Sequence, residues 1–128
     1  MRAVSTPTDL VRATFEESIR TPIQEEAVLL REVLTPRMAA YVTGVESTKT
    51  IARWARGETQ GIRPESEKRL RAAYAIVRLL SHFDAAPTIR GWFLGMNPFL
   101  DDASPADVLR AGDVGRVRAA ALAFAADG

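Results

Sequence analysis

Apolar residues recur along much of the chain at the three- and four-residue spacing of an amphipathic helix. The clearest case follows Pro64, where Leu70, Ala73, Tyr74 and Val77 share one predicted face. No stretch alternates apolar with polar residues for more than a few positions, so β-strands are not expected. The pattern predicts an all-α protein of seven or eight helices joined by short loops.

Cap residues and prolines indicate where these helices begin. Thr–Pro pairs at residues 21–22 and 35–36, and a Ser–Pro pair at 104–105, each predict an N-cap followed by a first-turn proline. Gln24 stands three residues after Thr21 and completes a predicted capping box. Residues 1–20 are predicted to be the most mobile part of the chain.

Basic side chains are concentrated in the middle of the 128-residue chain. Residues 1–34 carry 4 basic and 6 acidic side chains, residues 35–83 carry 9 and 4, and residues 84–128 carry 4 and 6. The three sums of −2, +5 and −2 add up to the net charge of +1. A basic centre indicates contact with an anion such as nucleic acid, and a solvated helix face is the alternative.

The basic centre contains the segment AAYVTGVESTKTIARWARG, residues 39–57. Two short helices that cross closely need a small residue on the first helix, here Ala39 or Ala40, and a glycine in the turn, here Gly44. Ile51 and Trp54 supply apolar anchors on the second helix. The segment is therefore typical of a helix-turn-helix.

The second helix of this motif is predicted to direct polar side chains outward. An arginine can contact a guanine edge, and lysine or threonine can bind a phosphate. The DNA-binding candidates are Thr48, Lys49, Arg53 and Arg56. The alternative is a plain helical hairpin, in which Ile51 and Trp54 belong to the core and both arginines are solvated.

The ending TIARWARG, residues 50–57, resembles the recognition helix of Xre-type, phage-repressor-like domains. The chain departs from that pattern between Gly44 and Ile51, where it has one residue more than the usual Xre turn. A longer turn changes the direction of the recognition helix, so the resemblance does not define how this helix would meet DNA.

The densest apolar and aromatic cluster lies nearer the C-terminus and comprises Trp92, Phe93, Leu94, Met96, Phe99 and Leu100. Such a cluster is either a second part of the core or a partner-binding surface. Aromatic residues at helical spacing usually point inward, which favours the core. A final helix over residues 114–126 carries a narrow apolar stripe.

The order of motifs in this region resembles the toxin-binding domain of Xre/MbcA/ParS-like antitoxins. The matching positions are Trp92, Asn97-Pro98, Leu100, Ser104-Pro105, Val108-Leu109, Gly112 and Val117. The preceding GVESTKTIARWARG, with its longer turn, is similar to the MbcA branch of that family. The two matches together cover residues 35–126 in the family's order.

This resemblance implies an antitoxin of a type II toxin–antitoxin pair. The usual partner is a RES-domain toxin that degrades NAD, and the antitoxin covers the toxin's active site, so the catalytic residues belong to the toxin. A hetero-oligomer of toxin and antitoxin is expected. Members with a competent helix-turn-helix also bind their own operator DNA, which would autoregulate the operon.

The toxin-binding candidates that follow from the resemblance are Trp92, Asn97, Arg116, Arg118, Leu122 and Phe124. The final helix could place an apolar stripe in a groove of the toxin while its arginines contact acidic or phosphate-binding surface. The alternative is that this helix closes the protein's own core, which is favoured for Val117 and Ala121.

Three segments are expected: residues 1–20 as an N-terminal segment, 21–60 as the helix-turn-helix region and 61–128 as a small toxin-binding helical bundle. The rival interpretation is a stand-alone DNA-binding transcriptional regulator whose C-terminal bundle mediates dimerisation. That rival predicts tight operator binding without a second protein, with an affinity that falls steeply as salt rises.

Few residues could carry catalysis, so an enzyme, a cofactor and a metal site are not expected. The chain has no cysteine, and its one histidine, His82, is expected near the end of the long helix. Asp101 and Asp102 are too few for a hard-cation site. No apolar run reaches the length of a membrane span, and the early residues lack a signal-peptide core, so a cytoplasmic protein is expected.

Overall fold

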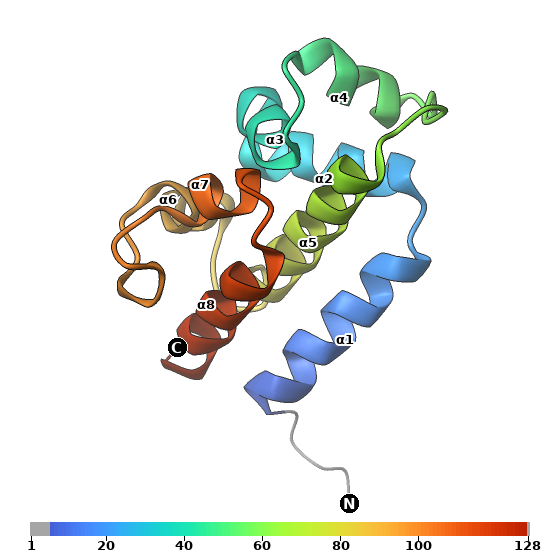
Figure 1. Cartoon of the computed structure of the whole chain (residues 1–128). Coiled ribbons are helices and arrows are strands. Elements are labelled where there is room, and N and C mark those ends of the chain that lie inside the picture. The colour runs from blue at the N-terminus through green and yellow to red at the C-terminus, as the bar shows by residue number, and fades with distance from the viewer. Residues whose placement is uncertain (1–5, 128) are drawn as a thin grey trace, which may run out of the picture.

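A computed structural model of the chain describes residues 6–127, and within them it is all-α, without a strand (Figure 1). The all-α prediction is thus confirmed for these residues. The elements are α1 (Pro7–Arg20), α2 (Ile23–Leu34), α3 (Pro36–Thr43), α4 (Thr48–Ala55), α5 (Pro64–Leu80), α6 (Ala86–Leu94), the 3-10 helix η1 (Pro98–Leu100), α7 (Pro105–Arg110) and α8 (Val114–Asp127).

Helix α5 is the central element, and α1, α2, α3, α7 and α8 all pack against it. Its apolar residues occur on more than one face, so residues 72–77 are buried without interruption. Figure 1 shows α1 along one side of α5, α8 along another, and α3 with α4 at its N-terminal end. A helical segment that is apolar on every side, as residues 72–77 are, is stable only inside such a bundle.

Residues 1–20 were predicted to be the most mobile part of the chain, but residues 7–20 form the capped helix α1. Thr6 and Asp9 form a capping box, in which the Thr6 hydroxyl accepts from the Asp9 amide at 3.1 Å and the Asp9 carboxylate accepts from the Thr6 amide at 3.2 Å. These backbone and side-chain bonds lower the pKa of Asp9. Val11, Thr14 and Ser18 form the buried face that packs on α5. Residues 1–5 lie outside the described part of the chain.

The capping box predicted at Thr21 is wrong. Pro22 occupies the N-cap position of α2 without a side-chain cap bond. The Thr21 hydroxyl instead donates to the Glu17 carbonyl oxygen at 2.8 Å and so belongs to the end of α1. Gln24 donates from Nε2 to the Ala55 carbonyl oxygen at 3.2 Å, which ties α2 to the end of α4. Only two residues separate α1 from α2. The Thr21 hydroxyl, which the sequence pattern assigned to the start of α2, therefore bonds to the end of α1 instead.

Two other predicted caps are confirmed. The Thr35 hydroxyl accepts from the Met38 amide at 3.3 Å, and the Ser104 hydroxyl accepts from the Asp107 amide at 3.0 Å. Prolines follow both caps at the start of α3 and α7. The sequence therefore located the starts of these two helices correctly.

One apolar core extends through the described residues. It includes Leu30 and Leu34 of α2, Ile51 of α4, Leu70 of α5 and Leu109 of α7, each no more than 1% exposed. Contacts between α2 and α5, and between α3 and α7, join residues on both sides of position 60. The division into segments 21–60 and 61–128 therefore describes the chain's order and not two separate cores.

Candidate functional site

The four DNA-binding candidates lie on the exposed side of α4 or at its end. Thr48, Lys49, Arg53 and Arg56 are all exposed, whereas Ile51 and Trp54 are buried against the core. The apolar anchors thus point inward and the polar candidates point outward, as the sequence pattern predicted. Arg56 Nε lies 2.9 Å from Glu58 Oε2 in an exposed ion pair, so one candidate already has a partner.

Helices α2, α3 and α4 pack on one another, and the turn between α3 and α4 positions α4. Gly44 ends α3 with φ +80°, and the Val45 amide donates back to the Ala40 carbonyl oxygen at 3.1 Å. The Ser47 hydroxyl then accepts from the Lys49 amide at 3.1 Å and begins α4. Two residues, 45 and 46, separate the glycine from this cap. DNA contact by α4 stays a prediction.

Arg69 of α5 lies against the turns that precede α4 and α8. A Cβ on Gly44 would lie 2.9 Å from Arg69 Nη1, and one on Gly112 would lie 3.3 Å from Nη2. Arg69 Nε donates to the Leu109 carbonyl oxygen at 3.2 Å, which holds the guanidinium between the two glycines. Both glycines have positive φ, so each position suits glycine on backbone and steric grounds.

Replacing Gly44 with alanine is expected to destabilise the protein more than the same change at Gly61. Both positions have nearly equal φ, +80° and +78°, but a Cβ at Gly61 meets nothing within 4 Å. The shared backbone strain costs about 1 kcal/mol. Gly44→Ala also displaces Arg69 from the Leu109 carbonyl, which adds about 1 kcal/mol. Urea unfolding of both variants measures the difference, and equal losses would contradict the role of Arg69.

Three of the toxin-binding candidates are partly buried by contacts within the protein itself. The Trp92 ring lies edge-on to Phe93 at 5.1 Å between centroids and tilted against Phe124 at 6.2 Å. Trp92, Leu122 and Phe124 are half-buried and pack against the core. The structure therefore brings Trp92 of α6 and Phe124 of α8 together, and each leaves part of its surface free to contact a partner.

Asn97 has a structural position. It is 9% exposed, and its Oδ1 accepts from the Phe99 amide at 2.9 Å, so it caps η1. Its backbone amide also donates to the Ala103 carbonyl oxygen at 3.2 Å, which closes the loop around η1. Asn97 thus shapes the segment between α6 and α7 and presents little of its own side chain.

The two arginine candidates on α8 both contact other elements. Arg116 Nη2 lies 3.4 Å from Asp101 Oδ2, and its Nε lies 3.9 Å from Asp113 Oδ2. The Arg118 guanidinium lies over the Phe15 ring of α1, 4.4 Å from the centroid. Both side chains remain exposed. Arg116 and Arg118 therefore lie on different sides of α8 and do not form one basic site.

The sequence pattern favoured the core for the whole apolar and aromatic cluster, but part of the cluster is exposed. Leu94, Met96 and Phe99 are 61%, 80% and 64% exposed, whereas Phe93 and Leu100 are buried. Gly95 and Pro98 interrupt the helical period here, so inward and outward positions could not be assigned from spacing. The two interrupting residues were the only sequence signal that the cluster divides.

An apolar cavity of about 250 Å³ lies beside Leu94, between α3, α6 and α7. Met38, Val42 and Ala106 contribute to its lining. The Tyr41 hydroxyl donates to Asp107 Oδ1 at 2.5 Å across one edge, and this bond raises the pKa of Tyr41. We call the surface formed by this cavity, Leu94 at the end of α6, Met96 and Phe99 of η1 the α6–η1 surface.

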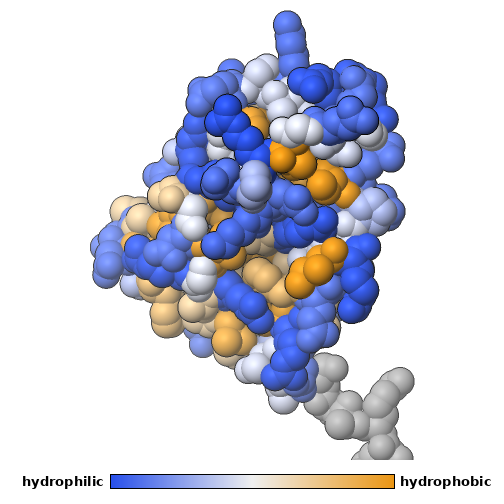
Figure 2. Space-filling view, turned by 45° about the vertical axis from the view of Figure 1, so that its right-hand side comes forward, coloured by the Kyte–Doolittle hydropathy of each residue, from blue (hydrophilic) through white to orange (hydrophobic). Residues whose placement is uncertain are grey.

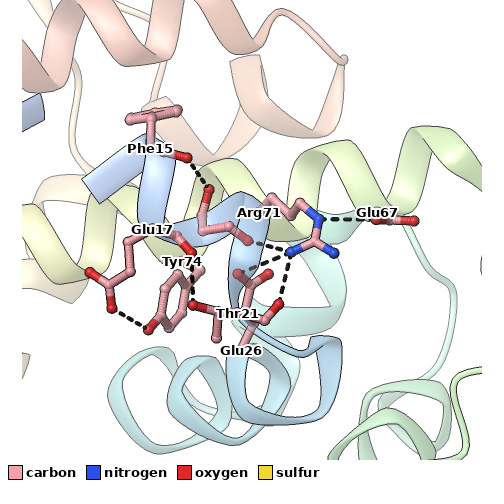
Figure 3. Close-up of polar contacts among 8 residues, drawn as sticks. Phe15, Glu17, Thr21, Glu26, Glu67, Arg71 and Tyr74 are labelled. Atoms are coloured by element: carbon pink, nitrogen blue, oxygen red, sulfur yellow. Dashed lines mark hydrogen bonds and ion pairs between the residues drawn. The ribbon is translucent and has the colours of Figure 1, made fainter. Parts of the chain in front are cut away.

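A partly buried polar cluster holds α1 and α2 against α5 (Figure 3). Arg71 of α5 donates to the carbonyl oxygens of Ser18 and Thr21, and its Nη1 lies 3.4 Å from Glu26 Oε2. Its Nε lies 3.0 Å from Glu67 Oε2. Arg71 therefore ties the carbonyl groups at the end of α1 to the carboxylates of α2 and α5.

Glu26 is the most perturbed acid in this cluster. It is 0% exposed, and its Oε1 has no hydrogen-bond partner. Burial raises the pKa of Glu26 from 4.5 to about 8, opposed by Arg71 and reinforced by the carboxylates of Glu67, Glu17 and Glu25. The group is enclosed by α1, α2 and α5, so it serves packing and is not placed to meet a substrate.

Within residues 6–127 no three His, Asp or Glu side chains are grouped to hold a metal ion. His82 is exposed just beyond α5, with Nδ1 2.9 Å from the Arg78 carbonyl oxygen. In the same part of the chain no helix is long and apolar enough to cross a membrane. Compared with known proteins, the chain matches no protein-family model, no curated protein and no solved structure.

Proposed function

We propose that the chain is the antitoxin of a type II toxin–antitoxin pair and neutralises a RES-domain, NAD-degrading toxin. The order of its motifs over residues 35–126 supports the family, and the α6–η1 surface supports protein binding. The chain acts by covering the toxin's active site, so it needs no catalytic residue, metal or cofactor of its own. The complex is a hetero-oligomer formed in the cytoplasm.

The observation that carries this proposal is the exposure of Leu94, Met96 and Phe99 within six consecutive residues. Large apolar side chains that are scattered singly need no explanation, but three within residues 94–99, of which Leu94 lines an apolar cavity, indicate a surface that a partner covers. Their removal from water on binding supplies affinity, since each buried side chain of this size contributes about 1.5–3 kcal/mol.

Helix α8 provides the second part of the proposed contact. Val117, Ala120, Ala121 and Ala125 are buried in the core, so the face opposite them is the one available to a toxin. The half-buried Phe124, seven positions after Val117, lies on the buried side of α8, and its ring packs against Trp92 of α6 beside the α6–η1 surface. The toxin is therefore expected to contact α6, η1 and α8 together.

Co-expression with the product of the adjacent gene tests the proposal. We expect a stable complex that survives purification, because an apolar contact of this kind persists at high salt. A chain that purifies alone, while the adjacent product is soluble and folded, would contradict the proposal and favour the regulator.

A stand-alone DNA-binding regulator is the second candidate, and the exposed basic side chains of α4 favour it. Exchanging both Arg53 and Arg56 for alanine is expected to weaken operator binding about 10- to 100-fold, since these arginines would contact phosphates or base edges. The control exchanges Arg12 and Arg20, which are exposed on α1. Mobility shifts on the promoter fragment measure both pairs, and equal affinities would refute DNA contact by α4.

A further inference from the structure

A second apolar groove lies between α1, α5 and α8, away from the α6–η1 surface. Its volume is about 330 Å³, and its apolar lining comes from Phe15 and Ile19 of α1, Ala72 of α5 and Val114 of α8. Figure 2 shows apolar surface among hydrophilic side chains on one face of the molecule. No residue of the α6–η1 surface lines this groove.

The apolar lining of the groove is exposed to solvent at Ile19. It is 70% exposed although it belongs to a helix whose other large apolar residues pack inward. The Arg118 guanidinium lies over one face of the neighbouring Phe15 ring, 4.4 Å from its centroid, whereas Ile19 has no comparable cover within residues 6–127. A partner that buried Ile19 would gain the free energy of removing most of an isoleucine side chain from water.

The rim of the groove is basic. Arg12, Lys68 and Arg118 line it from three different helices, against one carboxylate, Glu16. Arg12 pairs only loosely with Asp9, at 3.5 Å and with both side chains more than half exposed. Lys68 makes no ion pair with any residue from 6 to 127. Arg71 also lines the groove, but its guanidinium is taken up by Glu26 and Glu67.

The basic rim indicates which kind of partner can bind in the groove. A second copy of the chain would bring two basic rims together, each with a single Glu16 to offset three cations, and like charges oppose such a contact. A segment whose apolar side chains are flanked by carboxylates would fill the apolar lining and neutralise the rim. We infer that this groove receives an acidic amphipathic segment of the toxin.

The inference rests on the proposed function, and it adds a second contact to it. An amphipathic segment in such a groove places apolar side chains against Ile19 and Phe15 and carboxylates against Lys68 and Arg12. The toxin would then be held at the α6–η1 surface and across α1, which the family resemblance over residues 35–126 does not include.

The test uses four variants of the full chain, each co-expressed with the product of the adjacent gene. Ile19→Ser removes the exposed apolar side chain, and Lys68→Glu reverses a rim charge. Val28→Ser is the matched apolar control on α2, and Arg20→Glu is the matched charge control on α1 outside the groove. All four positions are exposed, so the variants are expected to fold, and circular dichroism confirms it.

We expect each groove variant to raise the dissociation constant of the complex about 10-fold or more and each control to change it less than about 3-fold. The loss for Lys68→Glu is expected to shrink at high salt, because the rim contact is solvent-exposed. Equal affinities for groove and control variants, with the wild-type complex intact, would overturn the inference and leave the proposed function standing. Absence of any wild-type complex would overturn both.

A photo-crosslinker at position 19 identifies the segment that lies in the groove. Mass spectrometry of the crosslinked complex is expected to find a toxin segment with at least two carboxylates flanking apolar residues. A crosslink to a basic or uncharged segment, or to a second copy of the chain, would overturn the inference. A crosslinker at position 28 is the control and is expected to give no toxin adduct.

Discussion

The triple exchange of Leu94, Met96 and Phe99 for serine is expected to weaken toxin binding at least about 100-fold. Each side chain is more than 60% exposed in the free protein, so the exchange removes apolar surface that only a complex would bury. Three such side chains account for about 3–5 kcal/mol of binding free energy, after allowance for incomplete burial. The largest loss is expected at Phe99, because aromatic anchors dominate interfaces.

The same exchange is expected to leave the fold intact. None of the three residues belongs to the buried core, and Asn97, which caps η1, is retained. The control replaces Val28 of α2 and Phe83 in the turn after α5, both exposed, with serine. Isothermal titration with the purified toxin compares the two variants. If both bind equally tightly, the toxin does not use the α6–η1 surface.

Exchange of Glu26 for glutamine is expected to make stability less dependent on pH. Below pH 4.5 the Glu26 carboxyl holds its proton in both states, so it adds no difference. Between pH 4.5 and about 8 the unfolded chain releases that proton and the folded chain keeps it, so the free energy of unfolding falls as pH rises. Above about pH 8 the folded chain releases it too, and the penalty stays constant.

The expected size of this effect is on the order of 4 kcal/mol, since a tenfold change in proton affinity corresponds to about 1.4 kcal/mol. Urea unfolding of the wild type and Glu26→Gln at pH 5 and pH 9 measures it, and the variant's advantage is expected at pH 9. Glu25→Gln, at an exposed neighbour on α2, is the control. Parallel pH curves for Glu26→Gln and the wild type would show that burial does not hold the proton.

The all-α fold could be predicted from the sequence because helical period and cap residues are local signals. Thr35 and Ser104 begin α3 and α7 as expected, and Gly44 ends α3. The cap predicted at Thr21 was wrong because a hydroxyl between two helices can bond to the end of the first or to the start of the second. Here it donates to the Glu17 carbonyl oxygen of α1. Helix α1 was missed because its stability comes from packing on α5, about 50 residues along the chain.

The candidate site was predicted only in part, for a similar reason. On α4 the period alone separates the buried Ile51 and Trp54 from the exposed Arg53 and Arg56. In the α6–η1 loop no period exists, and whether an apolar side chain is buried depends on which elements cover the loop. The sequence located the apolar segment there and could not tell the exposed Leu94 from the buried Phe93.

The most direct test of the central claim is an assay of NAD loss by the purified RES-domain toxin, titrated with this chain. We expect NAD consumption to stop once the chain saturates the toxin, and to continue when the Leu94, Met96 and Phe99 triple variant is added at the same concentration. Unchanged NAD consumption with saturating wild-type chain would contradict the claim.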